Sequence, residues 1–144
     1  MRTLLCVLVS MALAAACFAA QTKGRAYTPR PGTPERRAIL DSVRSHLGIK
    51  NQFEVAHMKV NEGWAFFRGN ALVFEQGEKL EVDSVMALLR QVDRGGKKTW
   101  QVESLWSLEK NSDQPMENFL EIFRRRQRDD RIPADIFPED VMKP

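Results

Sequence analysis

The sequence predicts a small α+β domain, in which an N-terminal helix packs on a curled four-stranded antiparallel sheet and a C-terminal helix follows. Residues 53–74 contain two stretches rich in aromatic and β-branched side chains, which suit a half-buried pleated surface. Amphipathic segments at 34–47 and 114–127 flank this region and can cover its faces. A chain of 144 residues is long enough for one core, and we expect a single domain over residues 34–138.

Residues 1–20 have the features of a signal peptide. Arg2 gives a positive start, residues 4–18 form an apolar run with no charge, and small residues precede a cleavage point at Ala19 or Ala20. A membrane anchor is the alternative, but a spanning helix needs about 20 strongly apolar residues and this run is short and alanine-rich. The residues up to Cys17 weakly resemble a lipobox, so lipidation at Cys17 is a further alternative. We expect a periplasmic or secreted protein of a Gram-negative-type envelope, with membrane contact only through this leader or Cys17.

The segment 21–33 is interrupted by Pro and Gly and predicts a flexible linker. Tyr27 lies in it, and a mobile linker would not hold a catalytic acid in place. The first helix should start at Thr33, a suitable N-cap, followed by a proline that fits the first helical position. Gly48 is the expected end of the helix.

Two strands should follow, joined at Asn61-Glu62-Gly63, where Asn and Gly tolerate the positive φ of a tight hairpin. Both faces of residues 64–74 are largely apolar, which is typical of a central strand covered on both sides. Gly69 predicts a bulge or bend that curls the sheet. Residues 75–81 are polar and turn-like.

Residues 82–92 fit a helix and a strand about equally well, because so short a run does not separate the two periods. The turn cluster 93–96 and the clear strand pattern of 99–108 favour a hairpin, so we predict a strand over 85–92. In the strand 99–108 the alternation places four apolar residues on one face: Trp100, Val102, Trp106 and Leu108.

The last helix should be capped by Asp113 and run to about Gln127, with an apolar stripe that includes Phe119 and Phe123. The arginine-rich run 124–128 ends it. Basic residues at the negative end of a helix are favourable, so we interpret the run as a solvated helix end; an anion-binding or membrane-surface patch is the alternative.

A succession of motifs resembles a broad set of small exported bacterial proteins of unknown function, with the pattern GWAF, ALLR and WxV. It consists of an N-terminal helix that starts Pro34-Glu35-Arg36-Arg37, then Gly63-Trp64-Ala65-Phe66-Phe67, Ala87-Leu88-Leu89-Arg90, a turn, and Trp100-Gln101-Val102. The resemblance covers roughly residues 34–108. It implies a cystatin-like or ketosteroid-isomerase-like order of elements, with one helix on a curled antiparallel sheet, and it implies no activity.

The composition and the residue types exclude several functions. A net charge of +3, from 22 basic and 19 acidic residues, is too small for nucleic-acid binding, which needs a concentrated basic face. Both cysteines, Cys6 and Cys17, would be lost with the leader, so no thiol nucleophile or disulfide remains. His46 and His57 have no neighbours at metal-ligand spacing. We therefore expect no cofactor and no metal site.

The candidate binding residues are the tryptophans and the cations at the expected hairpin tip: Trp64, Trp100, Trp106, Arg94, Lys97 and Lys98. The aromatic residues belong to the core or form a groove on one sheet face, and the core is the favoured interpretation. Lysines at a turn prevent edge-to-edge aggregation, and a contact with an acidic partner or an anionic envelope polymer is the alternative.

These observations favour a non-enzymatic binding module for an envelope protein or a small apolar ligand. The first alternative is a small isomerase- or hydrolase-like enzyme with a carboxylate buried in a sheet pocket, for which Glu54, Asp83 and Glu103 are the candidates. A surface-associated structural protein is the second alternative.

Overall fold

The computed structural model describes residues 24–144, so the predicted signal peptide and Cys17 lie outside the described residues. Its elements, in chain order, are α1 (Pro34–Leu47), β1 (Gln52–Asn61), β2 (Trp64–Glu75), β3 (Glu78–Arg94), β4 (Lys97–Ser107), α2 (Met116–Asp129), the 3-10 turn η1 (Ala134–Ile136) and α3 (Glu139–Met142). This confirms the predicted α+β class with one helix before the sheet and one after it.

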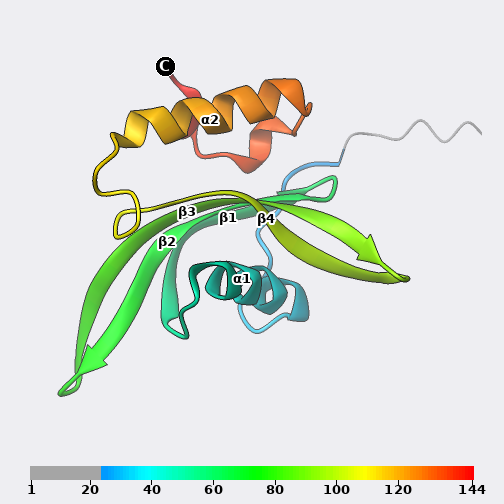
Figure 1. The fold of residues 1–144 in the computed structure, drawn as a ribbon. Coiled ribbons are helices and arrows are strands. Elements are labelled where there is room, and N and C mark those ends of the chain that lie inside the picture. Colours follow the sequence, from blue (N-terminus) through cyan, green and yellow to red (C-terminus); the bar gives the residue numbers. More distant parts are fainter. Residues whose placement is uncertain (1–23) are drawn as a thin grey trace, which may run out of the picture.

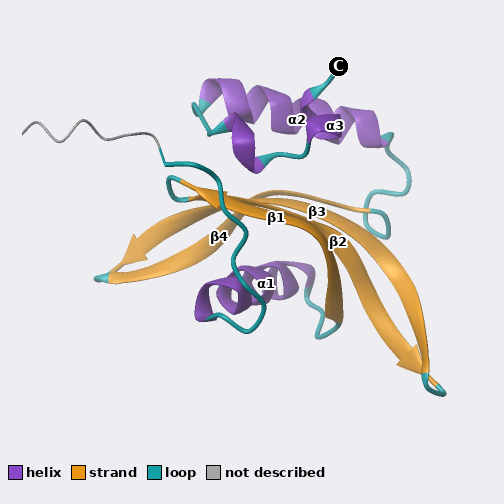
Figure 2. Cartoon of the chain, turned by 180° about the vertical axis from the view of Figure 1, so that it is seen from behind, coloured by secondary structure: helices purple, strands orange, loops and turns teal. Residues whose placement is uncertain are grey.

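The four strands form an antiparallel sheet in the order β1-β2-β3-β4, and the sheet arches over α1 (Figure 1). Helix α1 lies against the concave face, and α2 with the C-terminal segment lies over the convex face (Figure 2). The β2–β3 and β3–β4 hairpins extend past the helices toward opposite ends of the molecule. The fold therefore has three layers and two projecting arms.

Helix α1 has the predicted boundaries because its caps are encoded locally. The Thr33 hydroxyl accepts a hydrogen bond from the amide of Arg36 at 3.4 Å, and Gly48 closes the helix with a φ of 71°. Its apolar stripe, Ile39, Val43 and Leu47, is buried against the concave face of the sheet. The sequence interpretation of this helix is confirmed.

Strand β2 is central, as predicted from its two apolar faces. Phe66 and Phe67 are both 0% exposed, and Phe67 belongs to the α1 side whereas Phe66 belongs to the α2 side. At Gly69 the sheet bends: a Cβ there would lie 2.4 Å from the Glu54 carbonyl oxygen, and the extra residue, Ala56, is on the neighbouring strand β1. The close approach, rather than a bulge in β2 itself, requires the glycine.

The ambiguous segment 82–92 is part of a strand, which confirms the hairpin interpretation. Strand β3 is longer than predicted, because the turn before it consists only of Gln76 and Gly77, at φ values of 50° and 83°. Two consecutive residues with positive φ are typical of a tight hairpin turn. The prediction of a polar loop over 75–81 was therefore wrong: most of these residues are strand.

One prediction for strand β4 is also wrong. Leu88 pairs with Ser104 whereas Leu89 pairs with Val102, so Glu103 is an extra residue and forms a bulge. The bulge reverses the alternation. Trp100 and Val102 face the α1 side and Trp106 faces the α2 side, so these residues do not share a face.

The C-terminal helix begins later than expected. The turns of 108–114 precede it, and Pro115, with a φ of −58° and no amide hydrogen, is the residue before its first turn. Asp113 is therefore not the cap, and no side chain caps this helix. The chain then returns across the convex face through η1 and α3, which bury Ile136 and Val141 against the sheet and α2.

The interpretation of 124–128 as a solvated end fails at Arg124, which is 8% exposed. Its Nε donates to the Val141 carbonyl oxygen at 2.8 Å, another guanidinium nitrogen donates to the Lys143 carbonyl oxygen, and Nη1 lies 2.6 Å from the Glu117 carboxylate. This arginine fixes α3 to α2. Burying the Arg124 charge costs free energy, and hydrogen bonds to carbonyl oxygens of the C-terminal segment offset this cost. The sequence pattern around Arg124 does not show that these oxygens lie nearby.

The described part of the predicted flexible linker, residues 24–33, is held against the domain. Tyr27 and Val60 exchange two backbone hydrogen bonds of 3.0 and 2.8 Å, so this segment continues the sheet beyond β1. The Tyr27 hydroxyl donates to Glu35 at 2.8 Å, and burial together with this bond raises the pKa of Tyr27 to about 12. Tyr27 is a structural residue here.

Candidate functional site

The convex face is not fully covered, and the uncovered part contains a cavity of about 330 Å³. We call it the Trp106 cavity. It lies beside the first turn of α2, between that helix and the middle of β2 and β3. Ten residues line it: Ala56, Arg68, Gly69, Asn70, Ser84, Val85, Met86, Trp106, Leu108 and Met116.

The apolar part of this cavity consists of Trp106 and Met86, which are buried, and of Leu108 and Met116, which are 52% and 43% exposed at its rim. Large apolar side chains at a rim are unusual, because exposure to water costs about 25 cal/mol for each Å² of apolar surface. Methionine and tryptophan adapt readily to apolar ligands. The wall and the rim therefore form one apolar surface.

The Trp106 side chain carries an unsatisfied donor. The residue is 4% exposed, and its indole Nε1 is the buried side-chain nitrogen or oxygen without a hydrogen-bond partner in residues 24–144. A buried N–H without a partner costs about 1–3 kcal/mol, so nearly all such groups in folded proteins are paired. An acceptor brought by a ligand would recover this energy.

Three polar side chains also line the cavity, and one of them, Arg68, is the cross-strand partner of Met86. Arg68 donates to Asp140 at 2.6 Å, the Ser84 hydroxyl donates to the side-chain oxygen Oδ1 of Asn70 at 3.0 Å, and Nδ2 of Asn70 donates to Glu81 at 3.1 Å. Arg68 also holds the pKa of Asp140 below its ordinary value. The result is a cavity lined by both apolar side chains and hydrogen-bonded polar groups.

The structure separates the three predicted tryptophans. Trp64 lies on the α2 side with the Arg90 guanidinium carbon 5.5 Å from its ring, and Trp106 is buried on the same side in the cavity described above. Trp100 packs on the α1 side. The three residues therefore do not form one aromatic groove.

The predicted cations do come together. Arg94, Lys97 and Lys98 surround the tip of the β3–β4 hairpin, and with Trp100 they line a cleft of about 540 Å³ between β4 and α1. We call this the hairpin cleft. From α1 it receives His46 and other polar side chains. Four of the six predicted binding residues thus share one site.

The three candidate carboxylates of the enzyme alternative lie apart. Glu54 pairs with Lys79 at 3.0 Å, and this contact lowers the pKa of Glu54. Asp83 is buried, but its two oxygens accept from the Ser107 hydroxyl at 2.5 Å and from the Glu109 amide at 2.9 Å. Glu103 pairs with Arg126 at 3.2 Å. Each carboxylate has a structural partner.

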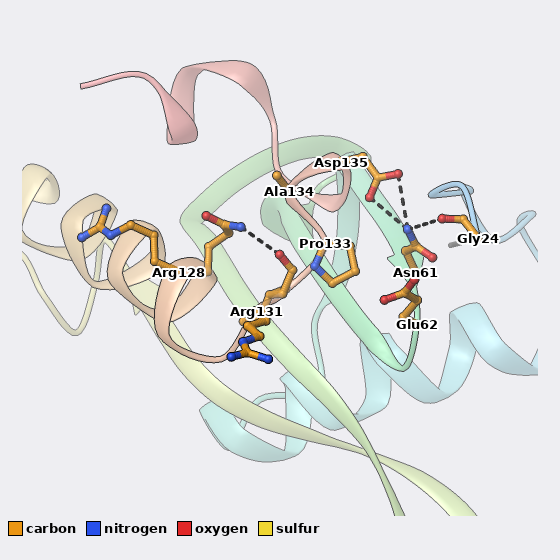
Figure 3. A pocket seen from close by; sticks show the side chains of 10 residues that line it. Gly24, Asn61, Glu62, Arg128, Arg131, Pro133, Ala134 and Asp135 are labelled. Carbon is orange, nitrogen blue, oxygen red and sulfur yellow. Dashed lines mark hydrogen bonds between the residues drawn. The ribbon is translucent and has the colours of Figure 1, made fainter. Parts of the chain in front are cut away.

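A polar hollow of about 660 Å³ lies at the other end of the convex face, between the β1–β2 turn and the end of α2. Its inner groups are already paired (Figure 3): the Asn61 amide donates to the Gly24 carbonyl oxygen at 2.7 Å and to Asp135 at 3.0 Å. Partial burial would raise the pKa of Asp135, but hydrogen bonds from the Ala26 amide and Asn61 outweigh it and lower the pKa. These contacts fasten residues 24–27 to the C-terminal segment.

Sequence reasoning missed most of the Trp106 cavity. The available signal was the pair Arg68 and Asn70, which interrupts the apolar central strand on either side of Gly69. Polar side chains on a strand that is otherwise covered on both faces need partners, and such partners often accompany a site. The rim residues Leu108 and Met116 gave no such signal.

Known proteins give no match for this chain: no family model, no curated protein and no solved structure is significantly similar to it. Within residues 24–144, no group of His, Cys, Asp and Glu side chains is arranged to hold a metal ion. In the same residues, none of the helices is long and apolar enough to cross a membrane.

Proposed function

We propose that the protein is an exported, non-enzymatic binding module that takes a small amphipathic molecule into the Trp106 cavity. The observation that carries this proposal is the buried indole N–H of Trp106, which has no acceptor within the described chain and belongs to a residue that lines an open cavity. A ligand with an acceptor at this point would pair the N–H, and its apolar part would lie on Met86, Leu108 and Met116.

The dimensions of the cavity favour a small ligand. Sites for small molecules usually measure about 300–1,000 Å³, and this cavity, at about 330 Å³, is at the lower limit. Arg68, which lines it, makes a carboxylate or another anionic acceptor suitable, because a guanidinium binds oxyanions well. A short-chain carboxylic acid combines both requirements.

Binding rather than catalysis is supported by the lining of the cavity. Among the described residues that line it, none carries a carboxylate, an imidazole or a thiol, so a general base is not provided there. The one buried carboxylate of the enzyme alternative, Asp83, lines a different pocket of about 80 Å³ and is occupied by two hydrogen bonds.

The proposal is tested by NMR titration with octanoate. The three tryptophans give three indole N–H resonances, and we expect octanoate to shift that of Trp106 while Trp64 and Trp100 stay in place. Trp106→Phe removes the N–H and keeps an aromatic ring; the affinity should fall about 3- to 10-fold, the value of one hydrogen bond.

Two further variants make the test specific. Met116→Asp places a negative charge at the exposed rim and should abolish binding of the anionic probe without loss of folding, since Met116 is 43% exposed. Leu80→Asp introduces the same charge at a position 40% exposed outside the cavity and is the matched control. Equal binding by Met116→Asp and Leu80→Asp, or shifts at all three indoles, would contradict the proposal.

A further inference from the structure

The two projecting hairpins carry opposite charges. The β2–β3 tip, residues 74–81, has three acidic side chains and one basic one; we call it the acidic arm. The β3–β4 tip, residues 93–98, has three basic side chains and one acidic one; we call it the basic arm. Both arms are ends of the same strand, β3, whose 17 residues span about 56 Å along their contour. The molecule therefore has a charge separation along one strand.

Each arm closes with a pair of like charges. Glu75 and Glu78 are direct cross-strand partners at the acidic tip, and Arg94 and Lys97 are direct cross-strand partners at the basic tip. Like charges directly opposite one another destabilise an antiparallel pair. A pair of opposite charges at the same positions would also be soluble and would stabilise the hairpin better, so solubility alone does not explain the like charges. An external group of opposite charge would relieve the repulsion at either tip.

These charges are available for an external contact. In residues 24–144, none of Glu75, Glu78, Lys97 and Lys98 has an ion-pair partner, and all are exposed. Arg94 reaches only the neutral Gln101. Elsewhere in the sheet, Glu54 pairs with Lys79 at 3.0 Å, Arg68 with Asp140 at 2.6 Å and Glu103 with Arg126 at 3.2 Å.

The acidic arm also exposes apolar surface. Phe74 and Leu80 are 57% and 40% exposed, and Val82, directly after the arm, is 50% exposed, although their strands continue into the core. Charges alone would keep a hairpin in solution, whereas large apolar residues on the same arm lose free energy in water. The combination of apolar and acidic side chains is typical of a surface that is covered in a complex.

We propose that the acidic arm of one copy docks into the hairpin cleft of a second copy, so that the protein associates head to tail. The cleft, of about 540 Å³, has the complementary properties: Arg94, Lys97 and Lys98 surround it, and Trp100 and Val102 provide apolar wall. The incoming Glu75 and Glu78 neutralise the basic pair, and Phe74 or Leu80 lies on Trp100.

The geometry makes this contact heterologous. The two arms point to opposite ends of the molecule (Figure 1), so each copy presents one donor arm and one acceptor cleft. A contact of this kind repeats until the copies close into a ring or grow as a filament. The association is independent of the Trp106 cavity, which lies on the other face of the sheet.

Sedimentation velocity of the protein, purified after expression of the whole chain, tests the proposal. At about 0.01 M salt the weight-average sedimentation coefficient should rise with protein concentration; at about 1 M salt, where the Debye length falls from about 30 Å to about 3 Å, it should fall toward the monomer value. A protein that stays monomeric at low salt over the whole concentration range would overturn the proposal.

Two charge variants identify the arms. Lys97→Glu turns the pair with Arg94 into an attractive one, and Glu78→Lys does the same for the pair with Glu75, so neither should unfold the hairpin. Each variant alone should be monomeric. An equal mixture should associate again, because one native acidic arm and one native cleft remain between them.

The control is Lys50→Glu, which makes the same charge change as Lys97→Glu at an exposed position between α1 and β1 that belongs to neither arm. It should associate as the wild type does. Loss of association in Lys50→Glu would mean that net charge, rather than the arms, is responsible. Separate variants that both still associate would equally exclude the arms as the contact.

Discussion

The two faces of the sheet are closed in different ways. On the concave face a single helix, α1, covers the buried residues of three strands, among them Met58, Phe67 and Leu89. That helix is capped at Thr33 and Gly48 and lies directly before the first strand in the chain. On the convex face the cover consists of α2, η1 and α3, a segment that begins only after all four strands are complete.

The convex cover depends on polar contacts from the sheet and from α2. His57 meets the Ile136 carbonyl oxygen at 2.7 Å, Arg68 pairs with Asp140, and Arg124 binds the carbonyl oxygens near the C-terminus. Each contact joins residues far apart in the sequence. Apolar burial closes most of the concave face, where the Ser42 hydroxyl also donates to the Trp100 carbonyl oxygen at 2.9 Å. The convex face combines apolar burial with several such anchors and leaves the Trp106 cavity open. A binding site is easier to accommodate on the convex face, because individual polar contacts hold its cover and leave space between them.

The largest expected effect separates the two faces within one strand. Phe66 and Phe67 are adjacent and both fully buried. The ring centroids of Phe67 and Phe53 are 5.1 Å apart, and those of Phe66 and Phe123 are 5.3 Å apart. Either alanine variant should lose about 3–5 kcal/mol of unfolding free energy in urea. Amide exchange should show Phe67→Ala releasing mainly α1, and Phe66→Ala releasing mainly α2.

Equal loss of protection in both helices for both variants would show that the two faces unfold as one unit, contrary to this comparison. If the alanine variants are too unstable to study, Phe66→Leu and Phe67→Leu make the same comparison with a smaller loss.

A medium effect is expected at the anchor of the convex cover. Arg124→Met keeps most of the apolar length of the side chain but leaves the Val141 and Lys143 carbonyl oxygens without their donor. We expect a loss of about 1–3 kcal/mol in urea unfolding and faster proteolysis after residue 137. Arg125→Met, on the exposed side of the same helix, is the matched control and should change stability by less than about 0.5 kcal/mol. If both variants lost the same unfolding free energy and were cleaved at the same rate, Arg124 would not be an anchor of the convex cover.

The same difference between the faces explains what the sequence could predict. Helix α1 and the strand β2 are specified by local signals: a capping threonine, a terminal glycine, and apolar residues on both faces of one strand. For these elements the prediction matches the structure. The convex cover is specified by contacts between distant residues, and there the predictions of a cap at Asp113 and of a solvated Arg124 were wrong.

The candidate site was predicted only in part for a related reason. An extra residue in a strand reverses every later side chain, and the bulge at Glu103 has no sequence signal such as glycine. Strict alternation therefore grouped Trp100 with Trp106, which lie on opposite faces. The cluster of Arg94, Lys97 and Lys98 was found because a hairpin tip is a local structure.

The smallest expected effect concerns the anchor at His57. Half-burial lowers the pKa of this imidazole, and Lys59 and Arg68 lower it further, whereas the hydrogen bond to the Ile136 carbonyl oxygen and the charge of Asp140 act in the opposite direction. A carbonyl oxygen only accepts, so Nε2 carries the proton in this contact and the neutral ring retains the bond.

The direction of the pH dependence follows from proton binding. In the unfolded chain the imidazole takes up a proton near its ordinary pKa of about 6.5, whereas the folded protein takes it up only at lower pH. Between these two values the unfolded state binds more protons, so the unfolding free energy should decrease as the pH falls below about 6.5.

Asp135 and Asp140 have lowered pKa values and lose their contribution at lower pH, so measurements above about pH 5 isolate the histidine. His57→Gln keeps a donor for the Ile136 carbonyl oxygen but does not titrate. Between neutral pH and about pH 5, the urea midpoint of this variant should therefore change less than that of the wild type. An identical pH dependence in the two proteins would show that His57 does not link protonation to the convex cover.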